Sequence, residues 1–283
     1  MVDIDEALPD FLGIGAQRSG TTWLYDKLRQ HPEICFPKHR KEVHYFDRYY
    51  ERGDEWYSSL FEHCHKKCKG EITPKYIYDE ECPRRIHELI PGAFLILILR
   101  NPIERAYSQF KLTIRESGYQ GSFENFLDST SDSRERGLYY KQLDRYLRYF
   151  SREQLLILFF SDLKEDPERV LREVCDFLGV SPSFEPAGLR EKENPSQTPR
   201  FQQVYSQVKR LVSKLYDWDL VLPIDLAKKL GLKKLFFSGQ NEKQFPPLTQ
   251  EVEEALTDYY REDVRKLSKL LDKDLLSQWD MEQ

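Results

Sequence analysis

Glycines, hydroxyl residues and one arginine are concentrated in Phe11-Leu-Gly-Ile-Gly-Ala-Gln-Arg-Ser-Gly-Thr-Thr-Trp-Leu24. The segment opens with apolar residues and leads into an amphipathic stretch, which predicts a strand, a tight glycine-rich turn and the start of a helix. Such a turn directs backbone N–H groups and the positive end of a helix dipole at one point. The chemistry that this arrangement suits is the binding of a phosphate or a similar anion.

This loop departs from the nucleotide-triphosphate loop G-x-x-x-x-G-K-[ST] at one position. Gly15 and Gly20 have the right spacing and Thr22 supplies the hydroxyl, but Thr21 stands where the lysine belongs. The positive charge lies inside the loop instead, at Arg18. Without the lysine the loop is a poor cradle for a γ-phosphate with Mg²⁺. It suits a terminal phosphosulfate, which carries less charge. The alternative is an ordinary glycine-rich turn that binds nothing.

A second segment, Lys38-His-Arg-Lys-Glu-Val-His-Tyr-Phe-Asp47, is dense in titratable side chains that apolar residues interrupt. That interleaving is not typical of a purely solvated run of charges. If the segment is extended, alternation places Glu42, His44 and Phe46 on one side. The alternative is a surface loop that happens to be rich in acidic residues and histidine.

The elements that must position these segments are those of an α/β protein. Residues 93–99 and 154–160 are continuous apolar runs, which predict strands covered on both faces in a parallel sheet. Ligands of such sheets bind at the carboxyl ends of strands, so Arg100 is expected in the site. Helical periodicity covers much of residues 123–150, and also 204–216 and 251–271.

Four segments resemble motifs of the sulfotransferases that use 3′-phosphoadenosine 5′-phosphosulfate (PAPS). Residues 17–23 resemble the 5′-phosphosulfate loop, in which the family usually has lysine at the position of Arg18. Residues 41–47 resemble the Lys-Glu-x-His-Phe-Phe-Asp motif of the glycan sulfotransferases that act on heparan sulfate. Residues 70–76 resemble a Glu-Lys-(Ser/Thr)-Pro-x-Tyr segment, with Ile72 in place of its lysine. Residues 100–108 resemble the 3′-phosphate motif Arg-x-Pro-x-x-Arg-x-x-Ser.

The resemblance implies a P-loop-like sulfotransferase fold with a central parallel sheet flanked by helices. Residues 1–283 would form one domain, with a nucleotide-binding core over 1–180 and a loop and helical part over 181–283. The implied reaction is in-line transfer of a sulfuryl group from PAPS to a hydroxyl, with an amine less favoured. The product is 3′-phosphoadenosine 5′-phosphate and no metal is required. The acceptor would be a glycan, a lipid or a small molecule such as a polyketide.

The resemblance also implies roles by position. Glu42 is the candidate base, supported by His44 and Asp47, and a carboxylate within hydrogen-bond reach suffices for this step. Arg18 stabilises charge, because arginine effectively never gives up its proton. The implied donor-binding residues are Arg18, Ser19, Gly20, Thr21, Thr22, Trp23, Arg100, Ser108 and Arg200. The implied acceptor-side residues are Lys41, Asp47, Thr73, Lys75 and Tyr76, with Lys75 or Lys41 replacing the lysine lost at Ile72.

Composition narrows the class of protein. A formal net charge of −5 over 283 residues argues against a general nucleic-acid binder. The acidic first residues do not resemble a signal peptide, and the longest apolar run is too short to span a membrane. Five cysteines cannot all pair, so we expect a reducing, cytoplasmic location. The segment 63–68 lacks a second ligand cluster, so we expect a polar loop there and no metal. The oligomeric state is not predicted.

Two other functions remain open at this point. An ATP-dependent kinase would share the strand, loop and helix, but it needs Mg²⁺ and an acidic partner where Arg100 stands. A nucleotide-binding protein without catalytic activity would share both phosphate sites.

Overall fold

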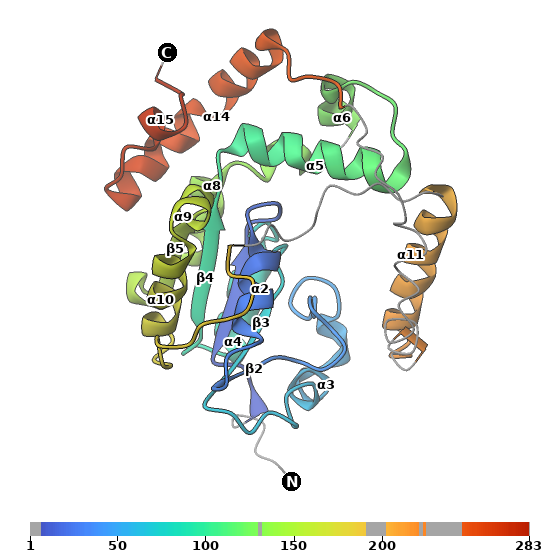
Figure 1. Cartoon of the computed structure of the whole chain (residues 1–283), viewed down its shortest axis with the longest axis vertical. Coiled ribbons are helices and arrows are strands. Elements are labelled where there is room, and N and C mark those ends of the chain that lie inside the picture. Colours follow the sequence, from blue (N-terminus) through green and yellow to red (C-terminus); the bar gives the residue numbers. More distant parts are fainter. Residues whose placement is uncertain (1–6, 130–131, 191–201, 221–222, 225–244, 283) are drawn as a thin grey trace. The chain divides into compact units, whose positions relative to one another are not determined.

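The computed structural model describes residues 7–129, 132–190, 202–220, 223–224 and 245–282 (Figure 1). The chain forms two compact units. The first comprises residues 1–105, 136–191 and 257–283, and the second comprises residues 106–135 and 192–256. The boundary between them falls within two helices, α5 (Pro102–Ser117) and α14 (Gln250–Leu271).

The first unit contains a five-stranded sheet in the order β2-β3-β1-β4-β5, and every pair of neighbours is parallel. The two apolar runs expected to be strands are confirmed as β4 and β5. The strands are β1 (Phe11–Gly15), β2 (Ile34–Cys35), β3 (Cys68–Ile72), β4 (Phe94–Leu99) and β5 (Leu155–Phe159). Because the order reverses around β1, the carboxyl ends of β1 and β4 lie at a switch point, where such sheets bind ligands. The α/β fold class predicted from the sequence is confirmed.

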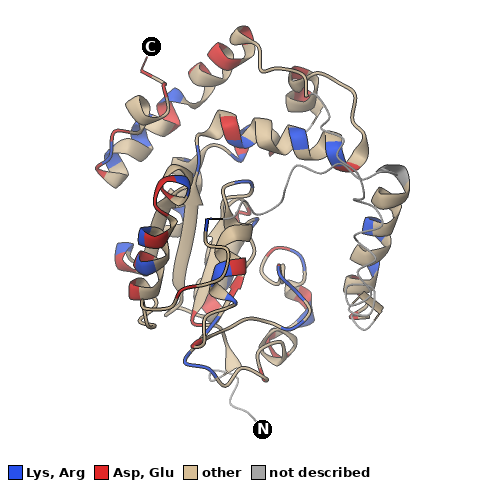
Figure 2. Cartoon of the chain, viewed as in Figure 1, with Lys and Arg blue, Asp and Glu red and all other residues tan. Residues whose placement is uncertain are grey.

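Helices of the first unit cover the sheet with apolar side chains. Residues of α2 (Thr21–Leu28) and α10 (Pro167–Phe177) form one core cluster with alternate residues of the strands, such as Ile96 and Ile98 of β4. Figure 2 shows β4 without charged residues, as expected for a strand buried on both faces. The remaining helices of this unit are α3 (Asp54–Ser59), α4 (Cys82–Leu89), α8 (Tyr139–Tyr146), α9 (Phe160–Glu165) and α15 (Leu275–Gln278), with short 3₁₀ turns η1 (Tyr50–Arg52) and η2 (Arg152–Gln154).

The described part of the second unit is helical. It contains α6 (Phe123–Ser129), α7 (Asp132–Glu135) and α11 (Gln202–Asp217), together with the adjoining parts of α5 and α14. Phe110 is fully buried and its ring contacts those of Phe123 and Phe126. The helical periodicity seen in this part of the sequence is therefore confirmed.

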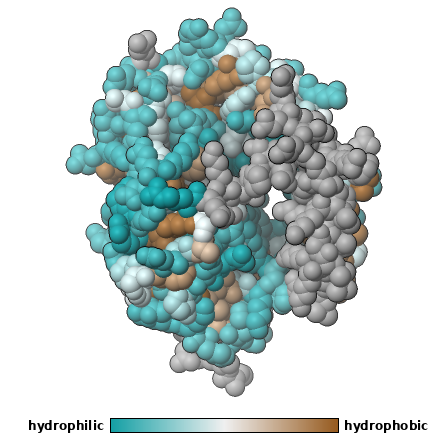
Figure 3. Space-filling view, in the orientation of Figure 1, coloured by the Kyte–Doolittle hydropathy of each residue, from teal (hydrophilic) through white to brown (hydrophobic). Residues whose placement is uncertain are grey.

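The surface in view is mostly hydrophilic and carries separate apolar patches (Figure 3), in keeping with a mean hydropathy of −0.68. Among the described residues, no helix combines the length and the hydrophobicity that crossing a membrane requires.

We predict that Gly70→Ala destabilises the first unit by about 1–3 kcal/mol through overpacking. Gly70 of β3 pairs with Phe11 of β1, and a Cβ at Gly70 would come within 2.1 Å of the Phe11 ring. Urea unfolding followed by circular dichroism measures the change. Gly92→Ala is the matched control, because no heavy atom lies within 4 Å of its added Cβ. Equal stability of the two variants would contradict the prediction.

Candidate active site

The glycine-rich loop after β1 turns through two left-handed residues before α2 begins. Arg18 has a φ of 71° and Gly20 a φ of 98°. A Cβ at Gly20 would come 2.9 Å from Leu163 Cδ2, so the loop requires glycine there for both backbone and packing reasons. The first N–H groups of α2 have no carbonyl partner within the helix, and they face outward at its N-terminus. The loop can therefore offer several donors to one anion.

Several side chains of this loop point into the protein. Ser19 is fully buried, and its backbone N–H donates to Ala16 O at 3.2 Å. Trp23 belongs to the core cluster, and its indole N–H donates to Leu189 O at 3.0 Å. Thr21 is also buried. The donor-binding residues predicted from the sequence therefore divide: the partly exposed ones are Arg18, Gly20 and Thr22, whereas the side chains of Ser19, Thr21 and Trp23 are buried supports.

Arg100 lies directly after β4 and reaches the same loop. Its Nη1 donates to Arg18 O at 3.2 Å, so the two arginines meet at the carboxyl ends of adjacent strands. Its Nε and Nη2 both donate to Glu104 Oε2, at 3.0 and 2.9 Å, and its guanidinium packs over the Phe160 ring. The two N–H groups that bind this carboxylate can also bind a phosphate oxygen.

The other two residues predicted to bind the donor are Ser108 and Arg200. Ser108 is buried on α5, in the part of that helix that belongs to the second unit. Arg200 lies outside the described residues.

The segment 41–47, called the base segment below, carries a chain of charge contacts. His44 Nε2 lies 3.3 Å from Glu42 Oε2, and His44 Nδ1 lies 3.0 and 3.1 Å from the two carboxylate oxygens of Asp47. Lys75 Nζ lies 3.2 Å from Asp47 Oδ2. The structure therefore brings together Glu42, His44, Asp47 and Lys75, all of which the sequence had singled out.

The base segment is not a regular extended strand. His44 has a φ of 58°, and this left-handed residue turns the backbone and breaks the alternation. Phe46 is consequently fully buried, whereas Glu42 and His44 are partly exposed and face each other. The expectation that Phe46 shares their side is wrong.

The contacts of the base segment fix the charge of its histidine. Burial by itself lowers the pKa of His44, but hydrogen bonds to Asp47 and Glu42, and the charges of both, outweigh it and raise the pKa from 6.5 to about 9. Burial by itself raises the pKa of Asp47, but hydrogen bonds from His44 and Lys75 and their charges lower it below its ordinary value. At neutral pH His44 is therefore protonated and holds two carboxylates.

Lys41 joins the base segment to the glycine-rich loop. Its Nζ donates to Thr22 Oγ1 at 2.6 Å, on the first turn of α2, and lies 3.8 Å from Glu42 Oε1. Ile72, which stands where the resembling motif has lysine, is fully buried in β3. Among the described residues, Lys41 and Lys75 are the lysines that contact side chains of the base segment or lie in it.

Thr73 and Tyr76, two residues predicted on the acceptor side, support the backbone of the base segment. Both are fully buried, and their hydroxyl groups are used internally. Thr73 Oγ1 accepts from Val43 N at 3.0 Å and donates to Glu71 Oε2 at 2.7 Å. Tyr76 Oη accepts from Tyr45 N at 2.9 Å and donates to Glu71 Oε1 at 3.0 Å. Neither side chain is exposed in this structure, and that Thr73 and Tyr76 bind the acceptor stays a prediction.

Glu71 is the residue of this region that sequence reasoning missed. It is fully buried in β3, and Tyr57 Oη also donates to it, at 2.7 Å. Burial raises the pKa of Glu71, and the hydrogen bonds from Thr73, Tyr57 and Tyr76 act in the opposite direction. The sequence signal that could have identified it is a glutamate directly before the apolar residue Ile72.

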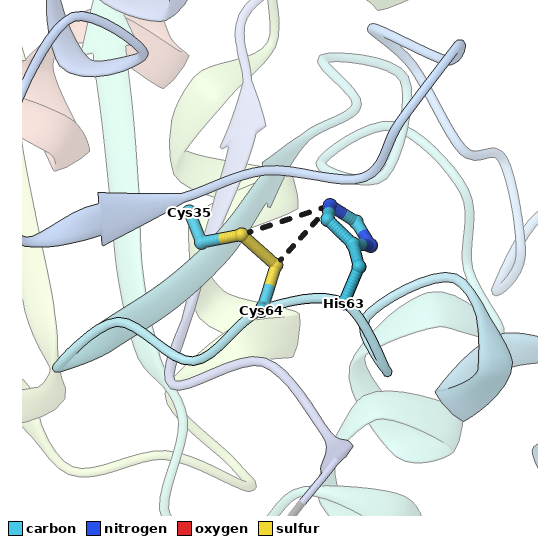
Figure 4. A group of neighbouring side chains, drawn as sticks. All are labelled: Cys35, His63 and Cys64. Atoms are coloured by element: carbon cyan, nitrogen blue, oxygen red, sulfur yellow. Dashed lines mark hydrogen bonds between the residues drawn. A yellow bond between two sulfur atoms is a disulfide. The ribbon is translucent and has the colours of Figure 1, made fainter.

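Among the described residues, one group of three metal-type ligands has all its ligand atoms within 4.8 Å of one another: Cys35, His63 and Cys64 (Figure 4). The two cysteines form a disulfide with a Cα–Cα distance of 5.7 Å, and His63 Nε2 lies 3.8 and 3.6 Å from their sulfur atoms. Sulfur atoms joined in a disulfide do not provide the thiolates that metals bind. Cys68 lies in β3 and not in a polar loop, so the expectation of a loop over 63–68 is wrong at its end.

Comparison with known proteins places this chain beside sulfotransferases. A family model described as sulfotransferase domain matches residues 8–268. The mouse bifunctional heparan sulfate N-deacetylase/N-sulfotransferase 4 is 31% identical over 286 residues, covering 93% of this chain and 30% of that protein. The human heparan sulfate glucosamine 3-O-sulfotransferase 6 is 35% identical over 184 residues, covering 61% of this chain and 52% of that protein.

A solved structure supports the same placement. A sulfotransferase from Alicyclobacillus acidocaldarius matches with a TM-score of 0.69 and 25% identity, covering 96% of this chain and 99% of that one. The chain spans about a third to a half of the length of the two curated relatives named above.

We predict that His44 stabilises the folded protein at neutral pH and that this stabilisation is lost at high pH. Because its pKa is raised to about 9, the charged contacts are fully present below about pH 6.5 and disappear as the pH rises through about 9. The difference in Tm between the wild type and His44→Gln should therefore be large at about pH 6 and small at about pH 10. His65→Gln, at an exposed position, is the control, and its difference in Tm from the wild type should not decrease between about pH 6 and about pH 10. A constant difference for His44→Gln would contradict the assignment.

Proposed function

The chain belongs to the sulfotransferase domain family, and we propose that it transfers a sulfuryl group from PAPS to a hydroxyl group of a sugar acceptor. The observation that carries the proposal is the contact between the two halves of the site. Lys41, next to the candidate base Glu42, donates to Thr22 at the N-terminus of α2 at 2.6 Å. An anion bound at that N-terminus would therefore lie beside a carboxylate.

The residues present fit PAPS. The glycine-rich loop offers α2 N–H groups, the Thr22 hydroxyl and the charge of Arg18 to the 5′-phosphosulfate. Arg100 would hold the 3′-phosphate, in place of the Glu104 carboxylate that it holds in this structure. That exchange is feasible because the Glu104 side chain is 53% exposed and can turn into solvent.

Proton transfer is assigned to Glu42. Its side chain is 34% exposed, so an acceptor hydroxyl can reach it. His44, protonated and held by Asp47, keeps the Glu42 carboxylate in place from behind. Arg18 contributes charge alone, because its guanidinium does not release a proton. Catalysis then depends on the positioning of the two substrates and on hydrogen-bond donors that are already in place before the reaction begins.

A sugar acceptor is supported by the surroundings of the base segment. The Arg52 guanidinium packs over the rings of Tyr49 and Trp56, with its centre 5.0 and 4.7 Å from their centroids. Arg40 packs against the same two rings, at 5.7 and 5.4 Å. Arg52 is partly exposed, so this cation and the rings beside it are available to an anionic glycan. Both curated relatives named above are heparan sulfate sulfotransferases by name.

The kinase alternative is not favoured. The loop lacks the phosphate-binding lysine of nucleotide-triphosphate loops, and Arg100 stands after β4 where a kinase needs an acidic Mg²⁺ partner.

We predict that Glu42→Gln lowers turnover by about 10²- to 10⁴-fold, because the amide cannot take the acceptor proton. Binding of 3′-phosphoadenosine 5′-phosphate should remain. Mass spectrometry of the sulfated product, with PAPS and desulfated heparan oligosaccharides as substrates, measures turnover, and calorimetry measures binding. Glu55→Gln, on the exposed surface of α3, is the control. Full turnover by Glu42→Gln would exclude it as the base, and sulfation of amino groups alone would redirect the acceptor proposal to an amine.

Arg18→Lys is expected to retain activity, since the charge is kept, whereas Arg18→Ala should lose about 10²-fold in turnover. Unchanged turnover in Arg18→Ala would show that the glycine-rich loop does not bind the sulfuryl donor.

Arg100→Ala should weaken binding of 3′-phosphoadenosine 5′-phosphate, measured by calorimetry, by about 10-fold or more, because a charge-assisted hydrogen bond is lost.

A further inference from the structure

The donor loop of this chain has no lysine of its own. In nucleotide-triphosphate loops a lysine precedes the hydroxyl residue and reaches the terminal phosphates. Here Thr21 occupies that position, and the cation within the loop is the guanidinium of Arg18. We propose that Lys41, which comes from the base segment, supplies the missing ammonium group and stabilises the leaving phosphate. This inference rests on the proposed function and assigns a second role to the base segment.

The geometry of Lys41 supports this role. Its Nζ donates to Thr22 Oγ1 at 2.6 Å and lies 5.9 Å from the centroid of the Tyr25 ring, one turn further along α2. The ammonium group is thus held against the first two turns of the helix whose N-terminus faces the anion. An ammonium group has three N–H donors, so its geometry allows it to contact Thr22 and an anion at the same time. The side chain is 30% exposed and therefore accessible to a ligand.

Other amines near the site are held in different places. Lys75 pairs with Asp47 at 3.2 Å and is separated from Glu42 by Asp47 and His44 in the series of charged contacts. Lys27, although on α2, is buried and donates to Ala187 O at 3.3 Å. Lys41, by contrast, is bonded to the first turn of α2.

The role of Lys41 fits a balanced transfer step. The acceptor oxygen bonds to sulfur while the bond between sulfur and the phosphate oxygen breaks, and the electron pair of that bond stays on the phosphate oxygen. Glu42 takes the proton of the acceptor hydroxyl. Lys41 keeps its own proton and donates a hydrogen bond to the oxygen that gains charge. Because Lys41 and Glu42 are consecutive, one segment positions both the proton acceptor and the charge stabiliser.

Two nucleotides that differ in one phosphate test this assignment. Wild type, Lys41→Met and the matched control Lys38→Met, an exposed lysine three residues earlier, are titrated by calorimetry. The ligands are adenosine 3′,5′-bisphosphate and adenosine 3′-monophosphate. We expect Lys41→Met to lose about 10-fold or more in affinity for the bisphosphate, as for one charge-assisted hydrogen bond, and little for the monophosphate. Lys38→Met should match the wild type with both ligands.

The outcomes separate this inference from the function on which it rests. Wild-type affinity of Lys41→Met for the bisphosphate, or an equal loss with both nucleotides, would overturn the role of Lys41 and leave the sulfotransferase proposal intact. Failure of the wild type to bind the bisphosphate would overturn the sulfotransferase proposal itself. Lys41→Arg keeps the charge and should retain most of the bisphosphate affinity. If Lys41→Arg lost as much affinity for the bisphosphate as Lys41→Met, that result would also overturn the proposal. Melting temperatures show that each variant is folded.

Discussion

The site depends on one buried carboxylate. Glu71 accepts hydrogen bonds from the hydroxyl groups of Tyr57, Thr73 and Tyr76 within the first unit. Burying a carboxylate costs several kcal/mol unless such donors compensate, so the three hydroxyl groups are held firmly in place. Two of them in turn accept backbone N–H groups of Val43 and Tyr45. The base segment has no regular secondary structure, and this network supplies the backbone partners that a strand would otherwise provide.

This support explains how an irregular segment can present charges in a fixed order. Outward from the network, Lys41 contacts the donor loop, Glu42 faces the solvent, and His44 and Asp47 lie behind Glu42. Neighbouring groups have opposite charges, so each stabilises the ionised form of the next. Groups that are already oriented and charged need little reorganisation when a reaction begins, which is the main electrostatic advantage of a preformed site.

The sheet topology supplies the other half of the site. Placing β1 between β3 and β4 brings the glycine-rich loop, the segment after Ile72 and Arg100 to one edge, although they are far apart in the sequence. The bond from Arg100 to Arg18 O is a direct consequence of that strand order. Neither charge periodicity nor spacing along the chain can reveal such a contact, because it depends on which strands are neighbours.

The sequence by itself determined the fold class, the glycine-rich loop and the candidate residues Glu42, His44, Asp47 and Arg100, because apolar runs, glycine spacing and motifs are local properties. The acceptor, the compartment and the roles of Ser108 and Arg200 remain predictions. Only the tertiary structure decided that Thr73, Tyr76 and Trp23 are buried, that Cys35 and Cys64 pair, and that Lys41 bonds to α2. These outcomes depend on burial and on contacts between distant segments. A residue type gives the chemistry available at a position, but packing decides whether a side chain faces a ligand or the core.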